Sequence, residues 1–305
     1  MSPSARAQWL IVAAIVAIDA IGLAHYGVEL RLDGLARGGG AIVLLAALAA
    51  FYTYRRPDDR LVDLAHTAAF LLALFAASGV LSYLAVATDL PRADDAFAAA
   101  DRALGFDWPA WFAWVHNHPH VWLILRFAYA SAIPQVIAIA TYLALTGQRD
   151  RNREFRWALI LSLLVIIPIS ALLPAAGAWV HYDAMRFADV AQIRDFAAMR
   201  AGTLHRLDLS KLEGLINFPS FHAALAIFFV YAVRRRMALL AFAAALNGVM
   251  IVAVLTEGGH YLVDAISGAA VAGAAITAAG RIEAALARKP LRAEPRRAPD
   301  TPVRT

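Results

Sequence analysis

The chain of 305 residues is 61% hydrophobic and has a mean hydropathy of +0.60. This composition is too apolar for a soluble globular protein and is typical of a protein that crosses a membrane several times. The absence of cysteine excludes a disulfide, a thiolate metal site and a thiol nucleophile, and the net charge of +5 does not by itself indicate a nucleic-acid partner.

The apolar runs predict an all-α fold, a polytopic bundle of about eight transmembrane helices. The amino-terminal run resembles a signal sequence, but we interpret it as an uncleaved first span. Prolines near residue 134 and in the fifth span predict kinks. The predicted spans are 9–25, 40–54, 61–87, 121–145, 155–175, 219–233, 237–255 and 260–279.

This pattern divides the chain into three parts. Residues 1–90 form the amino-terminal transmembrane helices, and 91–286 form a six-helix membrane catalytic core. Residues 287–305 are rich in proline, arginine and alanine, which predicts a disordered basic tail.

Charge predicts the orientation of the bundle. With eight spans, the basic loops at 54–60, 149–156 and 234–236 fall on the same side as both termini. The positive-inside rule makes that side cytoplasmic. We therefore expect a protein of the bacterial inner membrane, whose acidic loop at 89–107 and long loop at 176–218 lie on the periplasmic side.

Two short segments on that outer side carry the residues suited to chemistry. The first, Phe-Pro-Ser-Phe-His at 218–222, and the second, Gly-Gly-His-Tyr-Leu-Val-Asp at 258–264, each place a histidine at the start of an apolar run. On a helix, Asp264 would share a face with His260 one turn away. A carboxylate-held imidazole is a good nucleophile or base, and His222 could supply a proton to a leaving group.

The same positions favour an anionic substrate. Helix amino termini carry unsatisfied N–H groups and a partial positive potential, so two of them converging would form an anion site. The hydroxyl of Ser220 could add a further donor. These features indicate that a phosphoryl group is the natural occupant.

The two motifs also carry a family resemblance. Pro-Ser-Phe-His at 219–222 and His-Tyr-x-x-Asp at 260–264 resemble the second and third motifs of the type 2 phosphatidic acid phosphatase superfamily, and more closely its inositol phosphorylceramide synthase-like branch. The similarity covers about residues 100–280. It implies that His260 is the nucleophile that forms a phosphohistidine, that Asp264 orients it, and that His222 protonates the leaving group.

The phosphate-binding cations are less clear from the motifs. Phosphatases of this superfamily carry an arginine six residues before the third-motif histidine, where this chain has Val254. We therefore look to Arg200 in the long outer loop first, because a guanidinium can bind phosphate in a bidentate manner. Arg126, inside the fourth span, is the second candidate. Arg200 could equally be a solvated loop charge, and Arg126 could snorkel to the headgroups.

The predicted function is that of a lipid phosphatase or phosphotransferase acting on a lipid phosphate at the outer membrane face, without a metal or other cofactor. The missing arginine weakly favours transfer over hydrolysis. A transporter or flippase for anionic lipids is the alternative, and it predicts ionisable groups spread through the depth of several helices. A metallohydrolase would need a third ligand such as Glu257. The histidines at 116, 118 and 120 are better interpreted as part of an interfacial aromatic belt than as a metal site.

Overall fold

The computed structural model describes residues 2–184 and 190–288, and almost all of its regular structure is helical. In these ranges the β-structure is one parallel pair of two-residue strands, β1 (Glu29–Leu30) and β2 (Arg206–Leu207). The helices are α1 (Pro3–Tyr26), α2 (Leu32–Tyr54), α3 (Asp59–Val86), α4 (Asp94–Ala103), α5 (Trp108–His116), α6 (Pro119–Ala130), α7 (Ala132–Leu145), α8 (Arg149–Leu172), α9 (Ala178–His181), α10 (Val190–Arg200), the 3₁₀ turn η2 (Leu209–Lys211), α11 (Phe221–Ala232), α12 (Met237–Glu257) and α13 (Leu262–Arg288).

The predicted all-α membrane bundle is confirmed, although the number of full spans differs. Among the described residues, α1, α2, α3, α8, α12 and α13 are long and apolar enough to cross a membrane, and α6 with α7 would make a seventh. The remaining predicted span is α11, whose 12 residues reach only about 18 Å. By the length and composition of its helices, the chain is an integral membrane protein.

The predicted kink near Pro134 is a break between α6 and α7, which are bent by 46°. Proline has no N–H, and its ring clashes with the carbonyl four residues earlier. That position is Ala130, the last residue of α6. In contrast, Pro168 lies inside α8, which continues to Leu172.

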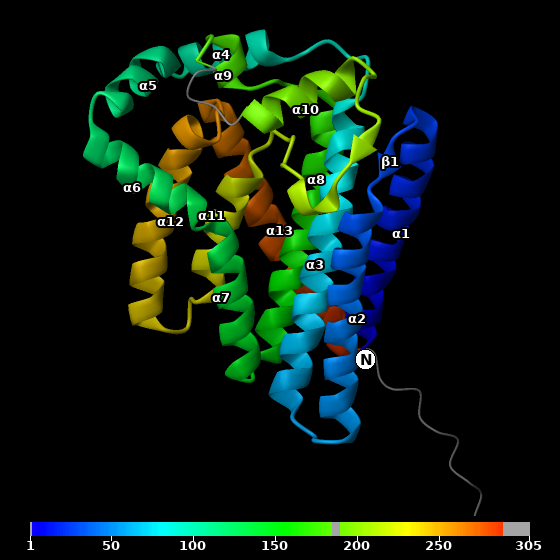
Figure 1. Cartoon of the computed structure of the whole chain (residues 1–305). Helices are drawn as coiled ribbons and strands as arrows, with labels where there is room; N and C mark the ends of the chain where they lie inside the picture. The colour runs from blue at the N-terminus through cyan, green and yellow to red at the C-terminus, as the bar shows by residue number, and fades with distance from the viewer. Residues whose placement is uncertain (1, 185–189, 289–305) are drawn as a thin grey trace, which may run out of the picture.

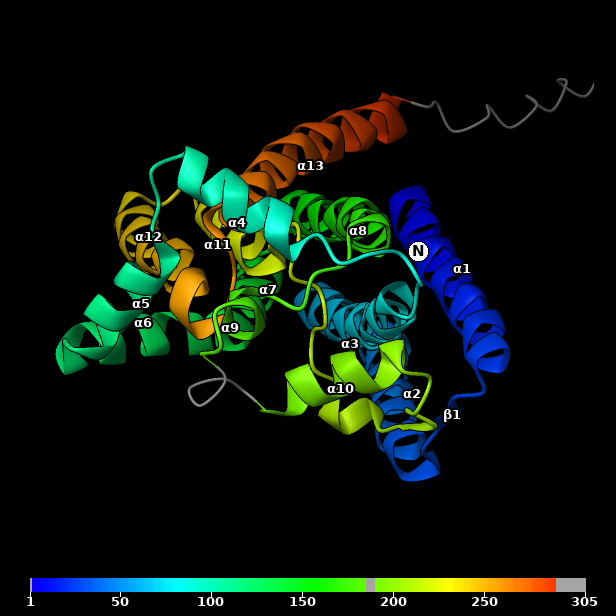
Figure 2. The same ribbon diagram turned by 90° about the horizontal axis from the view of Figure 1, so that it is seen from above.

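The centre of the bundle is built from α3, α8, α11 and α13, which pack against one another. Seen from above, α1 and α2 lie on one side and α12 on the other, with α3 and α8 between them (Figure 2). Large apolar side chains that are almost fully buried fill this core, among them Leu74, Leu159, Ile160 and Phe229.

The predicted outer loops are partly helical. Figure 1 shows α4, α5, α9 and α10 gathered over one end of the bundle, whereas the hairpin between α2 and α3 lies at the other end. The acidic loop forms α4 because its Asp94 and Asp101, seven residues apart, share a buried face with Phe97 and Ala98. This layer covers the end of the bundle at which α13 begins.

Helix α1 is tied to the rest of the fold at both of its ends. Strand β1, which follows α1, pairs with β2, where Glu29 lies opposite Arg206. At the other end of α1, the Ser4 hydroxyl donates to Glu283 near the end of α13 and accepts a bond of 2.9 Å from the Trp157 indole. The predicted tail at 287–305 lies outside the described residues from position 289 onward.

Candidate active site

The two motif segments meet at the start of α13. The backbone N–H of Ser220 donates to the backbone carbonyl of Asp264 at 3.0 Å, which joins the turn before α11 to the first turn of α13. Ser220 is also the N-cap of α11, where its Oγ accepts from the Ala223 N–H at 3.3 Å. The segments that the sequence analysis paired are therefore in direct backbone contact.

His260 lies between a carboxylate and a hydroxyl. Its Nδ1 is 3.1 Å from Oδ2 of Asp264, and its Nε2 is 3.2 Å from Oγ of Ser220. His260 is 3% exposed, and the other two side chains are fully buried. One expected detail is corrected: His260 does not lie on the helix, because α13 begins at Leu262. The i, i+4 contact is instead made across the turn that starts the helix, where the Tyr261 N–H also donates to Asp264.

Burial controls the charge of His260. Removal of the ring from water lowers the pKa of His260 to about 4, and a hydrogen bond with the Asn217 backbone works in the opposite direction. The imidazole is thus neutral at neutral pH. If Nδ1 carries its proton and donates it to Asp264, the lone pair of Nε2 faces Ser220, whose hydroxyl can donate to it.

His222 lies beside His260 and forms no hydrogen bond with it, with Asp264 or with Ser220. It lies in the first turn of α11, two residues after Ser220, and its ring stacks on Tyr129 with centroids 4.4 Å apart. The Tyr129 hydroxyl is 3.5 Å from Nδ1 of His222. His222 and His260 are close enough to interact electrostatically. The described structure therefore brings all three predicted catalytic side chains to one end of the bundle.

The space at this point is small. A cavity beside Asn217 and the Gly258–Gly259 turn has a volume of about 10 Å³, which is room for about one water molecule. A larger groove of about 630 Å³ lies nearby, and its lining includes Trp108, Phe112 and Tyr182. The cavity at Gly258–Gly259 is therefore smaller than a phosphate group.

The turn that carries His260 is held by two tryptophans. The Trp108 indole N–H lies 3.0 Å from the Leu255 carbonyl and 3.1 Å from the His260 carbonyl, and the Trp179 indole donates to the Thr256 carbonyl at 2.9 Å. Gly259 has a φ of +61°, and a Cβ there would lie 2.6 Å from the Trp179 ring. Only glycine fits this turn without strain.

The expectation that the α13 amino terminus binds an anion requires a correction. Asp101 of α4 already caps it: its two carboxylate oxygens accept from the N–H groups of Leu262 at 2.8 Å and Val263 at 3.0 Å. Desolvation by burial raises the pKa of Asp101. The protein thus satisfies this helix end with its own carboxylate, and the donors expected for phosphate are occupied.

The two predicted phosphate-binding arginines lie in different surroundings. Arg200 ends α10, and its guanidinium donates to the backbone carbonyls of Thr88 at 2.9 Å and Leu90 at 2.8 Å. These bonds tie α10 to the segment that follows α3. Arg126 is exposed on α6, stacks over Trp122 at 5.4 Å, and lies three residues before Tyr129 on the same helix. Phosphate binding by either arginine stays a prediction.

No group of three metal-ligating side chains occurs among the residues that the structure describes. Glu257, the third ligand considered for a metallohydrolase, hydrogen-bonds Trp122 and lies near His116 and Arg126. In the described chain it is therefore grouped with the aromatic belt and not with the pair of histidines.

The sequence analysis missed several residues that shape the site. Asp94 accepts from the Gly177 N–H at 2.9 Å and from the Tyr261 hydroxyl at 3.0 Å, and so connects α4 to the loop before α9 and to the third motif. Tyr129 supports His222 in the same indirect way. The seven-residue spacing of Asp94 and Asp101 was the available signal, since it places both carboxylates on one face of a short amphipathic helix.

Comparison with known proteins gave one match. The family model described as the PAP2 superfamily matches residues 95–278, which include both motif segments and exclude α1, α2 and α3. No curated protein and no solved structure matched the chain significantly.

Proposed function

The chain belongs to the PAP2 superfamily, whose members usually hydrolyse phosphate esters, and we propose that it cleaves a lipid phosphate or phosphodiester through a phosphohistidine at His260. The contact that carries this proposal is the buried Asp264–His260 pair, with 3.1 Å between Oδ2 and Nδ1. It supports a neutral imidazole whose second nitrogen is the nucleophile.

In the first proposed step, Nε2 of His260 attacks phosphorus, and the bond between phosphorus and the leaving oxygen breaks. Asp264 holds the proton on Nδ1 and stabilises the positive charge that forms on the ring, as the carboxylate does in other histidine-carboxylate pairs. The Ser220 hydroxyl, 3.2 Å from Nε2, would then donate to a phosphoryl oxygen.

In the same step, a proton from His222 goes to the leaving alkoxide. Burial lowers the pKa of His222 to about 3, so the ring must take up this proton when the phosphate anion binds beside it. Water or an alcohol next returns this proton to His222 and attacks phosphorus, so that the nitrogen–phosphorus bond breaks and His260 is regenerated. Water as acceptor gives a phosphatase, and a lipid or sugar hydroxyl gives a phosphotransferase. The absence of the family's arginine at Val254 favours transfer.

The substrate proposal rests on where this chemistry lies relative to the apolar helices. The pair lies between the end of α12 and the first turn of α13, two helices apolar enough to span a membrane, so the reacting phosphate would lie at headgroup depth. The groove of about 630 Å³ near Trp108 and Phe112 offers an apolar wall beside that end. The basic loops at the other end favour a periplasmic site.

The test is turnover by purified full-length protein in detergent micelles. The protein is incubated with lipids that carry a labelled phosphate, with and without an added alcohol and with and without a chelator. We expect a labelled, acid-labile phosphoenzyme and either free phosphate or a phosphorylated alcohol. Turnover without any phosphoenzyme, or full inhibition by the chelator, would overturn the phosphohistidine route.

A further inference from the structure

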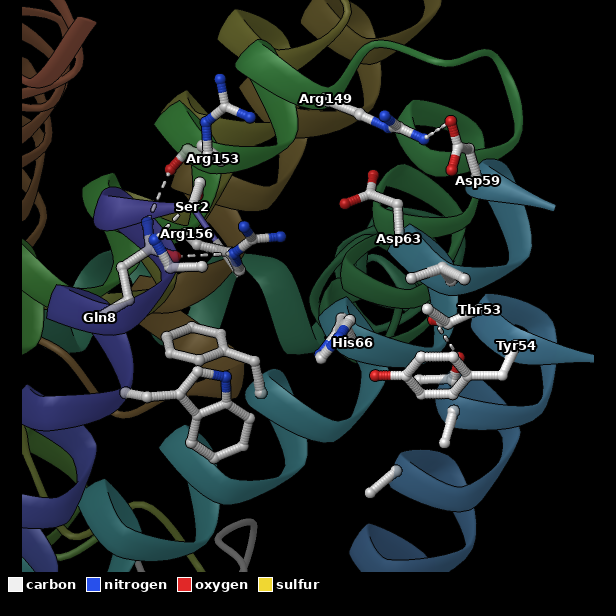
Figure 3. Close-up of a pocket in the computed structure, with 17 residues that line it drawn as sticks. Ser2, Gln8, Thr53, Tyr54, Asp59, Asp63, His66, Arg149, Arg153 and Arg156 are labelled. Carbon is white, nitrogen blue, oxygen red and sulfur yellow. Dashed lines mark hydrogen bonds and ion pairs between the residues drawn. The ribbon is translucent and has the colours of Figure 1, made fainter. Parts of the chain in front are cut away.

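A second polar pocket lies at the far end of the bundle from His260. Helices α1, α2, α3 and α8 enclose a cavity of about 560 Å³ at the start of α1, the end of α2 and the starts of α3 and α8 (Figure 3). Glu283, which bonds Ser4 beside this pocket, lies 23 residues along the chain from His260. At 1.5 Å per residue the two regions are separated by roughly 30 Å.

The pocket has one apolar and one polar wall. Trp9, Phe70 and Ala46 line the first, and Arg149, Arg153 and Arg156 line the second. In Figure 3 the arginines come from α8 at the upper side of the cavity, and Tyr54 and His66 border it from α2 and α3. This two-sided lining at the edge of an apolar bundle fits an amphipathic molecule better than a fully polar solute.

The guanidinium of Arg156 is the unusual group in this pocket. Arg156 is 6% exposed, and it donates from Nε to Gln8 at 2.9 Å and from Nη1 to Thr67 at 2.7 Å. Both of these partners are neutral, and among the described residues no carboxylate lies within 4.0 Å of the guanidinium. A buried cation without a counter-ion is costly, so its retention points to an anion that it serves.

The other two arginines already have partners. Arg149 pairs with Asp59 at 2.9 Å, and Arg153 pairs with Glu283 at 2.9 Å. Asp63 lines the same pocket but accepts from Asn152 at 2.9 Å, and it lies beyond ion-pair distance of Arg156. Arg156 lies over the Phe70 ring at 5.7 Å, and Asp63 and Glu283 act on its charge only from a longer distance. Of the three arginines, it is therefore the one without a carboxylate at ion-pair distance.

Helix α2 is the most exposed of the four helices that line the pocket. This helix has only Gly34 and Ala49 fully buried, and it packs mainly on α3. The pocket lies between α2 and α1, so a chain that enters from the membrane would lie along Trp9, Ala46 and Phe70. Helices α1, α2 and α3 also lie outside residues 95–278, so the pocket joins an amino-terminal addition to the family core.

We propose that this pocket binds a phosphate-bearing anion, supplied by the headgroup of an anionic lipid, with Arg156 as its main ligand. The phosphate accepts from Nη2 of Arg156, and the rim arginines add longer-range attraction. The acyl chain covers the apolar wall. The site is separate from the His260 centre and does not depend on the reaction proposed there.

The test is binding of dioctanoyl phosphatidylglycerol to the purified full-length protein in detergent, measured by native mass spectrometry. Every variant carries His260→Asn, so that no lipid is consumed. We expect saturable binding, weakened about tenfold by Arg156→Gln because one charge-assisted hydrogen bond is lost. Arg156→Lys keeps the charge and should recover part of the affinity. Arg55→Gln, which removes an exposed cation at the same end outside the pocket, should bind as the parent does.

A second pair of variants keeps every charge. Ala46 and Ala47 are both exposed on α2, but only Ala46 lines the pocket. Ala46→Trp should fill the cavity and weaken binding about tenfold, whereas Ala47→Trp should not. Dioctanoyl phosphatidylcholine should bind more weakly than the anionic lipid, and inorganic phosphate should bind more weakly still. Equal affinity of the parent, Ala46→Trp and Arg156→Lys for phosphatidylglycerol would overturn the proposal. If inorganic phosphate binds as tightly as the lipid, the proposal that a lipid headgroup supplies the anion is overturned.

Discussion

A Cβ atom on Gly268 would lie 2.1 Å from the carbonyl oxygen of Ser220. The helix α13 therefore touches the turn before α11 backbone to backbone, one helical turn beyond Asp264. The distance between Nε2 of His260 and Oγ of Ser220 depends on this close approach, because each atom belongs to one of the two elements. Asp264 and Gly268, four residues apart on α13, lie on the face of this helix that meets the second motif.

Gly268→Ala should separate the two motifs. The added methyl group cannot be accommodated by moving a side chain, since the atom it meets is backbone, and a displacement of about 1 Å at a catalytic centre can cost about 100-fold in rate. We expect kcat to fall by that order and thermal stability to fall with it. Gly273→Ala on the same helix has nothing within 4 Å and should behave as the parent in both assays.

Substitutions of His260 and Asp264 should separate the role of the nucleophile from that of the carboxylate that orients it. His260→Ala should abolish turnover and the acid-labile phosphoenzyme. Asp264→Asn leaves the nucleophile but removes the carboxylate that fixes the ring, so it should reduce kcat by roughly 10²- to 10⁴-fold. Single-turnover labelling would measure both. A phosphoenzyme that still forms at the parental rate in His260→Ala would remove His260 from the mechanism.

His222→Ala should show a leaving-group dependence. An alkyl phosphate needs a proton donor for its alkoxide, whereas an activated aryl phosphate leaves readily without one. We expect a loss of about 100-fold or more with the alkyl ester and a much smaller loss with the aryl ester. Equal losses with the two substrates would contradict the general-acid role of His222.

The acid limb of activity should lie below that of an ordinary histidine. With the pKa of His260 lowered from 6.5 to about 4, the nucleophile stays unprotonated as the pH falls from 7 to 5. The acid limb of kcat/KM that reports protonation of the nucleophile should therefore lie near pH 4. An acid limb centred near pH 6.5 in the pH–rate profile would show that His260 is not held neutral by burial.

The same group should make stability depend on pH. The folded-state pKa lies below the unfolded value, so the unfolded chain binds more protons between pH 4 and 6.5. The contribution of His260 to the unfolding free energy is full above pH 6.5. Roughly 3 kcal/mol of it is lost as the pH falls toward 4. The difference in unfolding free energy between the parent and His260→Gln, titrated with denaturing detergent, measures it.

Membrane orientation can be tested with single cysteines, because the chain has none of its own. Lys211 and Arg235 are both exposed, at η2 and at the connection between α11 and α12. If the site is periplasmic, Lys211→Cys should react with an impermeant thiol reagent in intact cells, and Arg235→Cys should react only after lysis. The opposite pattern would place the chemistry in the cytoplasm.

The long helices could be predicted from the sequence because sustained apolar runs have few alternatives in a membrane. The start of α2 was predicted eight residues too late, at residue 40 instead of Leu32, because the glycines at 38–40 favour a loop in isolation. The stretch begins against η2, where a Cβ on Gly34 would meet Asp208 and Leu209. The helices that cover the end of the bundle were missed for the opposite reason, because α4 is polar on average. The helix is explained only by the tertiary contacts that bury Asp94 and Asp101.

The site was predictable where it rests on local spacing and not where it rests on tertiary contact. The four-residue interval between His260 and Asp264 was enough to predict their contact. No local pattern could indicate that Asp101 would cap α13, because the two segments are 161 residues apart. The same holds for Arg200, whose bonds to backbone carbonyls near residue 88 depend on how α10 packs.

The bond between Ser4 and Glu283 also has a consequence for biogenesis. Its partners are 279 residues apart, so Ser4 meets the Glu283 carboxylate only when α13 has been made, after its other partner, Trp157 of α8, is already present. At about 5–20 residues per second, synthesis leaves Ser4 waiting for tens of seconds. Helix α8, whose Trp157 and Arg156 bond Ser4 and Gln8, is made earlier, so the contact with Glu283 is the last of these polar bonds to form. Truncation before residue 283 should therefore remove this bond and leave those to α8.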